Sequence, residues 1–310
     1  MSEPAVTLEG VRKSFGDHVA VDDLSLAIPR EALYGFIGPN GSGKTTTLRM
    51  ILRIFFPDRG RVVVLGRGEA RAADDRVDYL PEERGLYRKM KLRELLRFHA
   101  ELKGVRRPQQ TIAGWLDRFG LGPWADKTVE ALSKGMAQKV QFIAAVIHRP
   151  ELVILDEPFS GLDPVNLEVL KEAMLELRRE GTTVIFSTHD MAAAERLCDA
   201  VMMIHRGRKV LDGAPAAIRQ QYGSNAIRVR LGDPKVALAD LPGVDQVHDA
   251  GSGKELRLGD GADPQAILRA LIARTSVDHF EVTHPSLHEI FIRIAGPEAV
   301  REAEAQEVSA

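Results

Sequence analysis

The pattern of apolar and polar positions predicts alternating strands and helices along residues 5–222. Residues 5–37 alternate apolar and polar side chains as half-buried strands do. Residues 91–149 are mostly helical in pattern, with breaks expected at Pro108 and Pro123. Two short apolar strands and a helix between them are expected further along, at residues 152–155, 183–186 and 167–179. We therefore expect an α/β fold with N-terminal antiparallel strands, a parallel sheet and a helical insertion at about residues 86–150.

The sequence changes character after residue 222. Residues 226–296 mix strand and helix patterns over a short length, so we expect a small C-terminal α/β domain there. Its last helix is expected to begin at Pro285, with Thr283 or His284 as the N-terminal cap. The chain up to residue 222 would form the larger domain.

Composition and charge argue against several classes of protein. A net charge of -2 and a pI of about 6.5 predict no binding to nucleic acid. The single cysteine, Cys198, cannot form an internal disulfide, and no apolar run approaches the roughly 18 residues that cross a membrane. We expect a cytoplasmic protein that reaches the inner face of the cytoplasmic membrane only through a partner. Residues 297–310 contain four glutamates, one arginine and no apolar periodicity, and are expected to be disordered.

The most informative motif is a complete phosphate loop between a predicted strand and a predicted helix. In such loops backbone N–H groups surround an anion, Lys44 reaches the β- and γ-phosphates, and the hydroxyl of Thr45 coordinates Mg²⁺. The helix N-terminus that follows also favours negative charge. The residues expected to bind the nucleotide here are Gly38, Pro39, Asn40, Gly41, Ser42, Gly43, Lys44, Thr45 and Thr46.

Two carboxylates follow the apolar strand at residues 152–155. Asp156 at the end of this strand is expected to hold the Mg²⁺ that Thr45 also binds. Glu157 comes next and is expected to orient or deprotonate the attacking water. A phosphate loop and these carboxylates together predict a P-loop NTPase core.

These motifs, in this order, resemble those of the nucleotide-binding subunits of ABC transporters over about residues 5–222. The resemblance gives further residues a role. Residues 132–136 occupy the position of the family's signature, residues 160–163 resemble its D-loop, and His189 resembles its switch histidine. By this resemblance Phe15 stacks on adenine, Glu82 falls in the family's glutamine loop as an oxygen ligand of the metal, and ATP contacts extend to Ser133, Gly135 and Asp163.

The sequence departs from the family pattern at three positions. The signature usually reads Leu-Ser-Gly-Gly-Gln, and here Lys134 and Met136 replace one of its glycines and its glutamine, while Ser133 and Gly135 remain. Lys134 either adds a cation beside the phosphate or faces solvent. Glu82 stands where the family has glutamine, which adds a negative charge near the metal. With these departures and the sequence Pro-Glu-Glu-Arg-Gly-Leu-Tyr at residues 81–87, the chain resembles a subgroup of exporter ATPases. That subgroup includes sodium-efflux and antibiotic-resistance systems.

The resemblance implies an ATPase that powers export through a separate integral-membrane permease, with ATP and Mg²⁺ as cofactors. Because one chain has one phosphate loop and one signature, it also implies a second ATP-binding subunit, as a homodimer. The catalytic residues would be Lys44, Glu157 and His189. The alternatives are a soluble ABC-type ATPase without a membrane partner, a P-loop GTPase and a non-catalytic nucleotide-gated scaffold. The transported substrate is not encoded in this chain.

Overall fold

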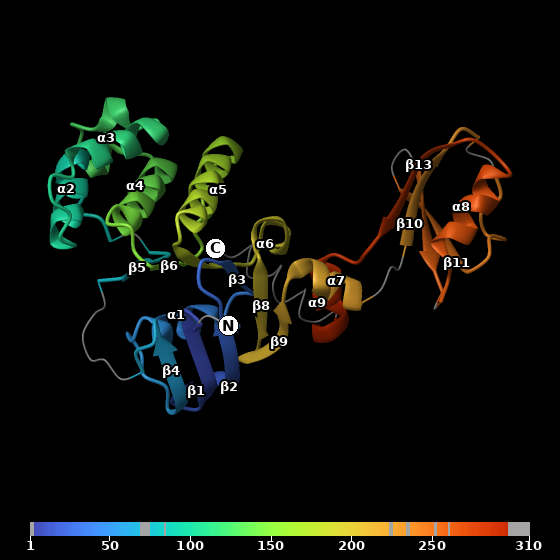
Figure 1. The fold of residues 1–310 in the computed structure, drawn as a ribbon, viewed down its shortest axis with the longest axis horizontal. Coiled ribbons are helices and arrows are strands. Elements are labelled where there is room, and N and C mark those ends of the chain that lie inside the picture. Colours follow the sequence, from blue (N-terminus) through green and yellow to red (C-terminus); the bar gives the residue numbers. More distant parts are fainter. Residues whose placement is uncertain are drawn as a thin grey trace. The chain divides into compact units, whose positions relative to one another are not determined.

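The computed structural model divides the chain into two units, the first ending at Ala214 and the second beginning at Pro215 (Figure 1). The residues that it describes are 3–68, 75–83, 85–222, 226–233, 236–250, 253–259 and 261–296. The tail expected to be disordered, residues 297–310, lies outside this range. No helix within the described ranges is long and apolar enough to span a membrane.

A six-stranded sheet forms the centre of the first unit. Its strands are, in spatial order, β5 (Val77–Leu80), β6 (Leu152–Leu155), β7 (Thr183–Thr188), β3 (Leu33–Ile37), β8 (Ala200–His205) and β9 (Arg208–Gly213). Neighbouring strands run parallel except for β8 and β9. Every residue of β3, β6 and β7 is buried, which explains the continuous apolar runs of β3 and β6 and the apolar centre of β7, residues 184–186.

A second sheet in this unit is antiparallel, with β1 (Val6–Phe15) between β2 (His18–Ile28) and β4 (Arg59–Val64). Figure 1 shows these three strands side by side. Alternate residues of β1 such as Val6 and Leu8 are buried, and they share one apolar core with α1 (Lys44–Ile51) and with the central sheet. The expected α/β fold with N-terminal antiparallel strands is confirmed.

The helical insertion lies between β5 and β6. It contains α2 (Leu92–Leu102), α3 (Gln109–Arg118) and α4 (Lys134–Val146), together with two short 3-10 helices, Gly122–Trp124 and Val129–Ala131. The α-helices are interrupted at residues 103–108 and 119–133, which contain the two prolines, Pro108 and Pro123, where breaks were expected. Two more helices, α5 (Pro164–Arg179) and α6 (Met191–Leu197), follow β6 and β7 and complete the alternation of strands and helices.

The second unit is a small antiparallel sheet with helices. The strands lie in the order β11 (Val244–Ala250), β12 (Gly253–Leu258), β10 (Ala226–Leu231) and β13 (Val277–Thr283). Helix α8 (Pro264–Ile272) covers one face, where Ile227, Leu256 and Ile267 form a separate apolar core. Helix α7 (Pro215–Gln221) belongs to this unit and packs on α9 (Leu287–Ala295).

The cap predicted for the last helix was wrong. Helix α9 begins at Leu287 and not at Pro285, and its cap is Ser286. The Ser286 hydroxyl accepts the backbone N–H of Glu289, while the carboxylate of Glu289 accepts the backbone N–H of Ser286. This reciprocal pair satisfies two N–H groups that a helix start leaves free, which is why the helix starts two residues later.

Candidate functional site

The phosphate loop lies between the end of β3 at Ile37 and the start of α1 at Lys44. Gly43 is the N-terminal cap of α1 and has a φ of 107°, a backbone conformation that residues with side chains rarely adopt. A Cβ atom at Gly43 would lie 2.5 Å from the backbone oxygen of Ala20, so only glycine fits. The glycine thereby brings the N-terminus of α1 up to the loop, where free N–H groups and the helix dipole favour an anion.

Lys44 is buried inside this loop. Its Nζ donates hydrogen bonds to the backbone oxygens of Gly38 at 2.7 Å and Pro39 at 3.1 Å, and it lies 3.9 Å from Oε1 of Glu157. Burial lowers the pKa of Lys44, while nearby carboxylates, Glu157 foremost, oppose this shift. The ammonium group is held mainly by neutral carbonyl oxygens, so a phosphate would be a stronger partner for it.

Asp156 follows β6 directly and is only 1% exposed. Its carboxylate accepts hydrogen bonds from the hydroxyl groups of Thr45 at 3.3 Å, Tyr79 at 3.2 Å and Ser187 at 2.5 Å. Burial and the negative charge of Asp156 raise the pKa of Tyr79 to about 12, so its phenol remains a donor at neutral pH. These three hydroxyl groups satisfy the buried charge.

Glu157 has a φ of 46°, in the left-handed region that is unusual for a residue with a side chain. Its backbone N–H donates to Oγ of Ser187 at 2.9 Å, and its Oε2 lies 3.1 Å from Nδ1 of His189. Its Oε1 is buried and has no hydrogen-bond partner among the residues that the structure describes. One carboxylate oxygen is therefore available to a bound molecule.

A cavity of about 350 Å³ opens beside these groups. Phe15 at its edge keeps 45% of its surface exposed, and its ring packs edge-to-face on Phe55 with 5.2 Å between centroids. A ring that is braced from one side and open on another is suited to stacking on a nucleobase. The residues that line the cavity are Phe15, His18, Ala20, Asn40, Gly41, Gly43, Lys44, Thr45, Thr46, Glu82 and Glu157.

Glu82 contributes a carboxylate to the same cavity. Burial raises its pKa, and the negative charges of Asp156 and Glu157 raise it further. The cavity therefore has the negative charge that attracts a divalent metal, although the described residues contain no group of three or more His, Cys, Asp or Glu side chains placed to hold one by themselves.

The predicted signature and D-loop residues do not line this cavity. Ser133 is the N-terminal cap of α4 and accepts the backbone N–H of Met136 at 3.3 Å, and Gly135 lies in the first turn of that helix. Asp163 caps α5 and accepts the backbone N–H of Asn166 at 3.0 Å. The cavity of one chain thus combines the phosphate loop with Phe15, Glu82 and Glu157, but not with Ser133, Gly135 and Asp163.

Lys134, for which the sequence left two alternatives, packs on the D-loop. A Cβ atom at Gly161 would lie 2.6 Å from Cε of Lys134, so the lysine stem covers this glycine. The residue is nevertheless exposed. Its cation faces solvent in a single chain while its aliphatic part contacts the neighbouring loop.

The contacts of Tyr79 and Ser187 were not predicted from the sequence, although Tyr79 lies three residues before Glu82 and Ser187 two residues before His189. Each hydroxyl donates to Asp156, from strands β5 and β7 on the two sides of β6. Both contacts could have been predicted from the positions of Tyr79 and Ser187, which lie near the carboxyl ends of the strands on either side of β6. Such ends meet at one edge of a parallel sheet.

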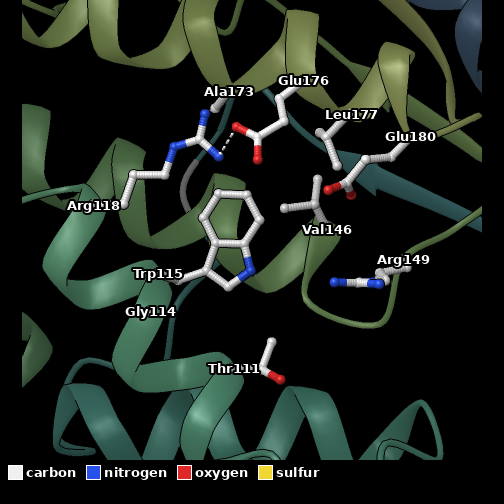
Figure 2. Close-up of a pocket in the computed structure, with 10 residues that line it drawn as sticks. All are labelled: Thr111, Gly114, Trp115, Arg118, Val146, Arg149, Ala173, Glu176, Leu177 and Glu180. Atoms are coloured by element: carbon white, nitrogen blue, oxygen red, sulfur yellow. Dashed lines mark ion pairs between the residues drawn. The ribbon is translucent and has the colours of Figure 1, made fainter.

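A second cavity, of about 310 Å³, lies among α3, α4 and α5 (Figure 2). Arg118 of α3 forms an ion pair with Glu176 of α5 at 2.5 Å, and its guanidinium lies over the ring of Trp115, 5.3 Å from the centroid. None of the predicted site residues lines this cavity. The ion pair between Arg118 and Glu176 joins the helical insertion to α5.

Replacing Ser187 with alanine should destabilise the protein. The change removes the donor to Asp156 and the acceptor of the N–H of Glu157, both buried, so the free energy of unfolding should fall by about 1–3 kcal/mol in urea denaturation. Ser160→Ala, at an exposed serine of the adjoining loop, is the matched control and should change it by less than about 0.5 kcal/mol. Unchanged stability of the Ser187 variant would contradict the described network.

Comparison with known proteins identifies the family. Residues 21–160 match the family described as ABC transporter, and residues 213–295 match that described as ATP-binding protein DrrA1-3-like, C-terminal domain. An uncharacterized ABC transporter ATP-binding protein of Bacillus subtilis (strain 168) is 41% identical over 293 residues, which cover 94% of this chain and 98% of that protein. The Nod factor export ATP-binding protein I of Rhizobium sp. (strain N33) is 34% identical over 305 residues, 96% of this chain and 99% of that one.

The fold agrees with this assignment. A solved structure of an ATP binding subunit of an ABC transporter superposes with a TM-score of 0.67 and 32% identity, covering 71% of this chain and 93% of that chain. This likeness confirms the predicted P-loop NTPase core. The chain belongs to the family of ABC transporter ATP-binding proteins, and its ATP-binding domain hydrolyses ATP.

Proposed function

We propose that this chain is the ATPase subunit of an exporter, that it acts as a dimer, and that a separate integral-membrane permease carries the substrate. The observation that carries the proposal is the match to a Nod factor export protein over 96% of this chain, which includes the C-terminal unit. The chain would lie on the inner face of the cytoplasmic membrane, held there by its permease. The alternative, a soluble ABC-type ATPase without a membrane partner, is tested by the last experiment below.

Lys44 and the N-terminus of α1 would bind the β- and γ-phosphates of ATP. The Nζ of Lys44 already points to carbonyl oxygens of the loop at 2.7 and 3.1 Å, so a small displacement would exchange them for phosphate oxygens. Adenine would stack on the exposed ring of Phe15, which is worth about 1–3 kcal/mol. The remaining loop residues would supply backbone N–H groups to the phosphates.

The groups around Asp156 fit a magnesium ion that arrives with ATP. The hydroxyl of Thr45 and the carboxylate of Asp156 are hard oxygen donors 3.3 Å apart, and the carboxylate of Glu82 lines the same cavity. Thr45 and Asp156 would hold the ion, with Glu82 as a further oxygen ligand. When bound, Mg²⁺ would neutralise charge that develops on the phosphates.

Glu157 would take the proton of the attacking water. Its Oε1 is buried without a hydrogen-bond partner in the described part of the chain, and the residue lines the nucleotide cavity. His189, 3.1 Å from the other carboxylate oxygen, would orient the carboxylate and contact the γ-phosphate. The left-handed backbone of Glu157 is the kind of strain that is found at catalytic positions.

A second chain would complete the site. Ser133 and Gly135 lie at the N-terminus of α4, where a helix favours an anion, yet they do not line the cavity of their own chain. We infer that ATP is held between the phosphate loop of one subunit and the Ser133, Gly135 and Asp163 region of the other. The γ-phosphate would close the two subunits together, and hydrolysis would release them.

Glu157→Gln should abolish hydrolysis and preserve ATP binding. The amide keeps the shape of the side chain but cannot accept the proton, so turnover should fall about 10²–10⁴-fold. Because the γ-phosphate then stays in place, Mg·ATP should hold the variant as a dimer in size-exclusion chromatography. Turnover within a few-fold of wild type would refute the proposed role of Glu157.

Mixing two inactive variants should restore activity if the site is shared. Gly135→Asp brings a carboxylate beside the γ-phosphate and Lys44→Ala removes its cation, so each homodimer should be nearly inactive. In a mixed dimer both lesions fall in one site and the other site is intact, so ATPase activity should return, or one Mg·ATP should be bound if the two sites must fire together. Normal hydrolysis by Gly135→Asp protein as a monomer would exclude the shared site.

The membrane partner can be tested with the same hydrolysis-deficient variant. Tagged Glu157→Gln protein, purified from detergent-solubilised native membranes with Mg·ATP, should retain an integral-membrane protein in a fixed ratio. The wild-type subunit should then hydrolyse ATP faster with that protein in lipid vesicles than alone. Recovery of the ATPase only from the soluble fraction, unaffected by any membrane protein, would favour the soluble alternative.

A further inference from the structure

Helix α4, which begins with the signature, carries three polar side chains on buried positions. Gln138, Lys139 and Gln141 are 3%, 7% and 6% exposed, although they are surrounded by apolar residues of the same helix. Buried polar side chains need hydrogen-bond partners, so each of the three must reach one nearby. Their four partners lie in the loops after β5 and β6, at the end of α3 and in α5.

Two of these side chains hold the loops that present the proposed catalytic and metal-binding carboxylates. Nε2 of Gln138 donates to the backbone oxygen of Pro158, the residue after Glu157, at 3.2 Å. Nε2 of Gln141 donates to the backbone oxygen of Glu83, the residue after Glu82, at 3.4 Å. One helix is thus hydrogen-bonded to both of the loops whose carboxylates, Glu82 and Glu157, line the nucleotide cavity.

The third side chain connects the same helix to the D-loop region. Nζ of Lys139 donates to the backbone oxygen of Phe119 at 2.7 Å and to Oδ1 of Asn166 at 2.8 Å. The backbone N–H of Asn166 in turn donates to Asp163. These contacts fix α4 against α5 and leave it little freedom to move alone.

Fold stability alone does not explain a glutamine at position 141. Its Oε1 is buried and has no hydrogen-bond partner among the described residues. A half-satisfied buried amide is unfavourable, and an apolar side chain of similar length would avoid that cost. The amide group is therefore better explained by the hydrogen bond that its nitrogen donates to the loop of Glu82.

We infer that Gln138 and Gln141 are positioning residues that couple the two ATP sites of the dimer. This inference rests on the proposed shared site. Within one subunit, Glu82 and Glu157 would act on the ATP held by that subunit, whereas Ser133 and Gly135 would act on the ATP of its partner. Because α4 carries Ser133 and Gly135 and is bonded to both carboxylate loops, a shift of those loops moves the signature as well.

The test is the ATP dependence of hydrolysis by the full chain carrying both Gln138→Met and Gln141→Met. Methionine keeps the length and removes the amide, so the carbonyl oxygens of Pro158 and Glu83 lose these donors and the melting temperature should fall by a few degrees at most. The affinity of a single site for a fluorescent ATP analogue should be unchanged. The turnover number should fall about 10–100-fold, as for a misplaced catalytic group. The Hill coefficient, bounded by two sites, should fall from above 1 in wild type to about 1.

Gln110→Met is the matched control, because this glutamine is exposed at the start of α3, and it should behave as wild type. If the double variant proves unstable, Gln141→Met alone is assayed with the same expectation for the Hill coefficient. A variant that keeps the wild-type Hill coefficient and turnover overturns the inference, as does a wild-type coefficient of 1 in a protein that dimerises. Loss of ATP-dependent dimerisation in Glu157→Gln protein instead removes the proposed function itself, and the inference with it.

Discussion

The buried carboxylate of Asp156 is the interaction on which the rest of the site depends. A carboxylate that leaves water loses several kcal/mol of hydration unless hydrogen bonds replace it. Here the hydroxyl groups of Thr45, Tyr79 and Ser187 do so, from α1, β5 and the end of β7. One charge therefore holds three elements, far apart in the sequence, at fixed positions relative to each other.

The parallel sheet makes this convergence possible. Leu155 at the end of β6 pairs with Phe186 of β7, and Ile37 at the end of β3 pairs with Thr188, so the three strands end at one edge. The phosphate loop leaves β3 there, the two carboxylates leave β6, and His189 follows β7. The polar groups of the site meet because β6, β7 and β3 are neighbours in the sheet and end at the same edge. The residues that follow each strand supply the chemistry of the site.

The elements that could be predicted from the sequence are those with a local signal. The phosphate loop, the apolar strands around it and the carboxylates after residue 155 each follow from spacing within about ten residues. The contacts of Tyr79 and Ser187 with Asp156 depend on which strands are neighbours, and no local pattern contains that order. The breaks in the helical insertion at Pro108 and Pro123 also have a local signal, because proline interrupts a helix. The cap at Ser286 was missed, since helix ends are decided by competing caps and by packing.

Several features of the isolated chain are unfavourable by themselves, and they gather around one cavity. Lys44 is a buried cation whose pKa is lowered mainly by burial, and the pKa of Glu82 is raised by burial and by the charges of two other carboxylates. Glu157 combines a left-handed backbone with an oxygen that has no hydrogen bond in the described part of the chain. A phosphate with its metal would offset the costs at Lys44 and Glu82, because the phosphate would bring a closer anion to Lys44 and the metal would bring a cation to the carboxylates. A ligand that binds the folded chain and not the unfolded chain stabilises the fold. Because ATP would relieve these costs, its binding would stabilise this edge of the sheet. The same edge is joined by hydrogen bonds to α4, so the added order would extend to the helix that begins at the signature.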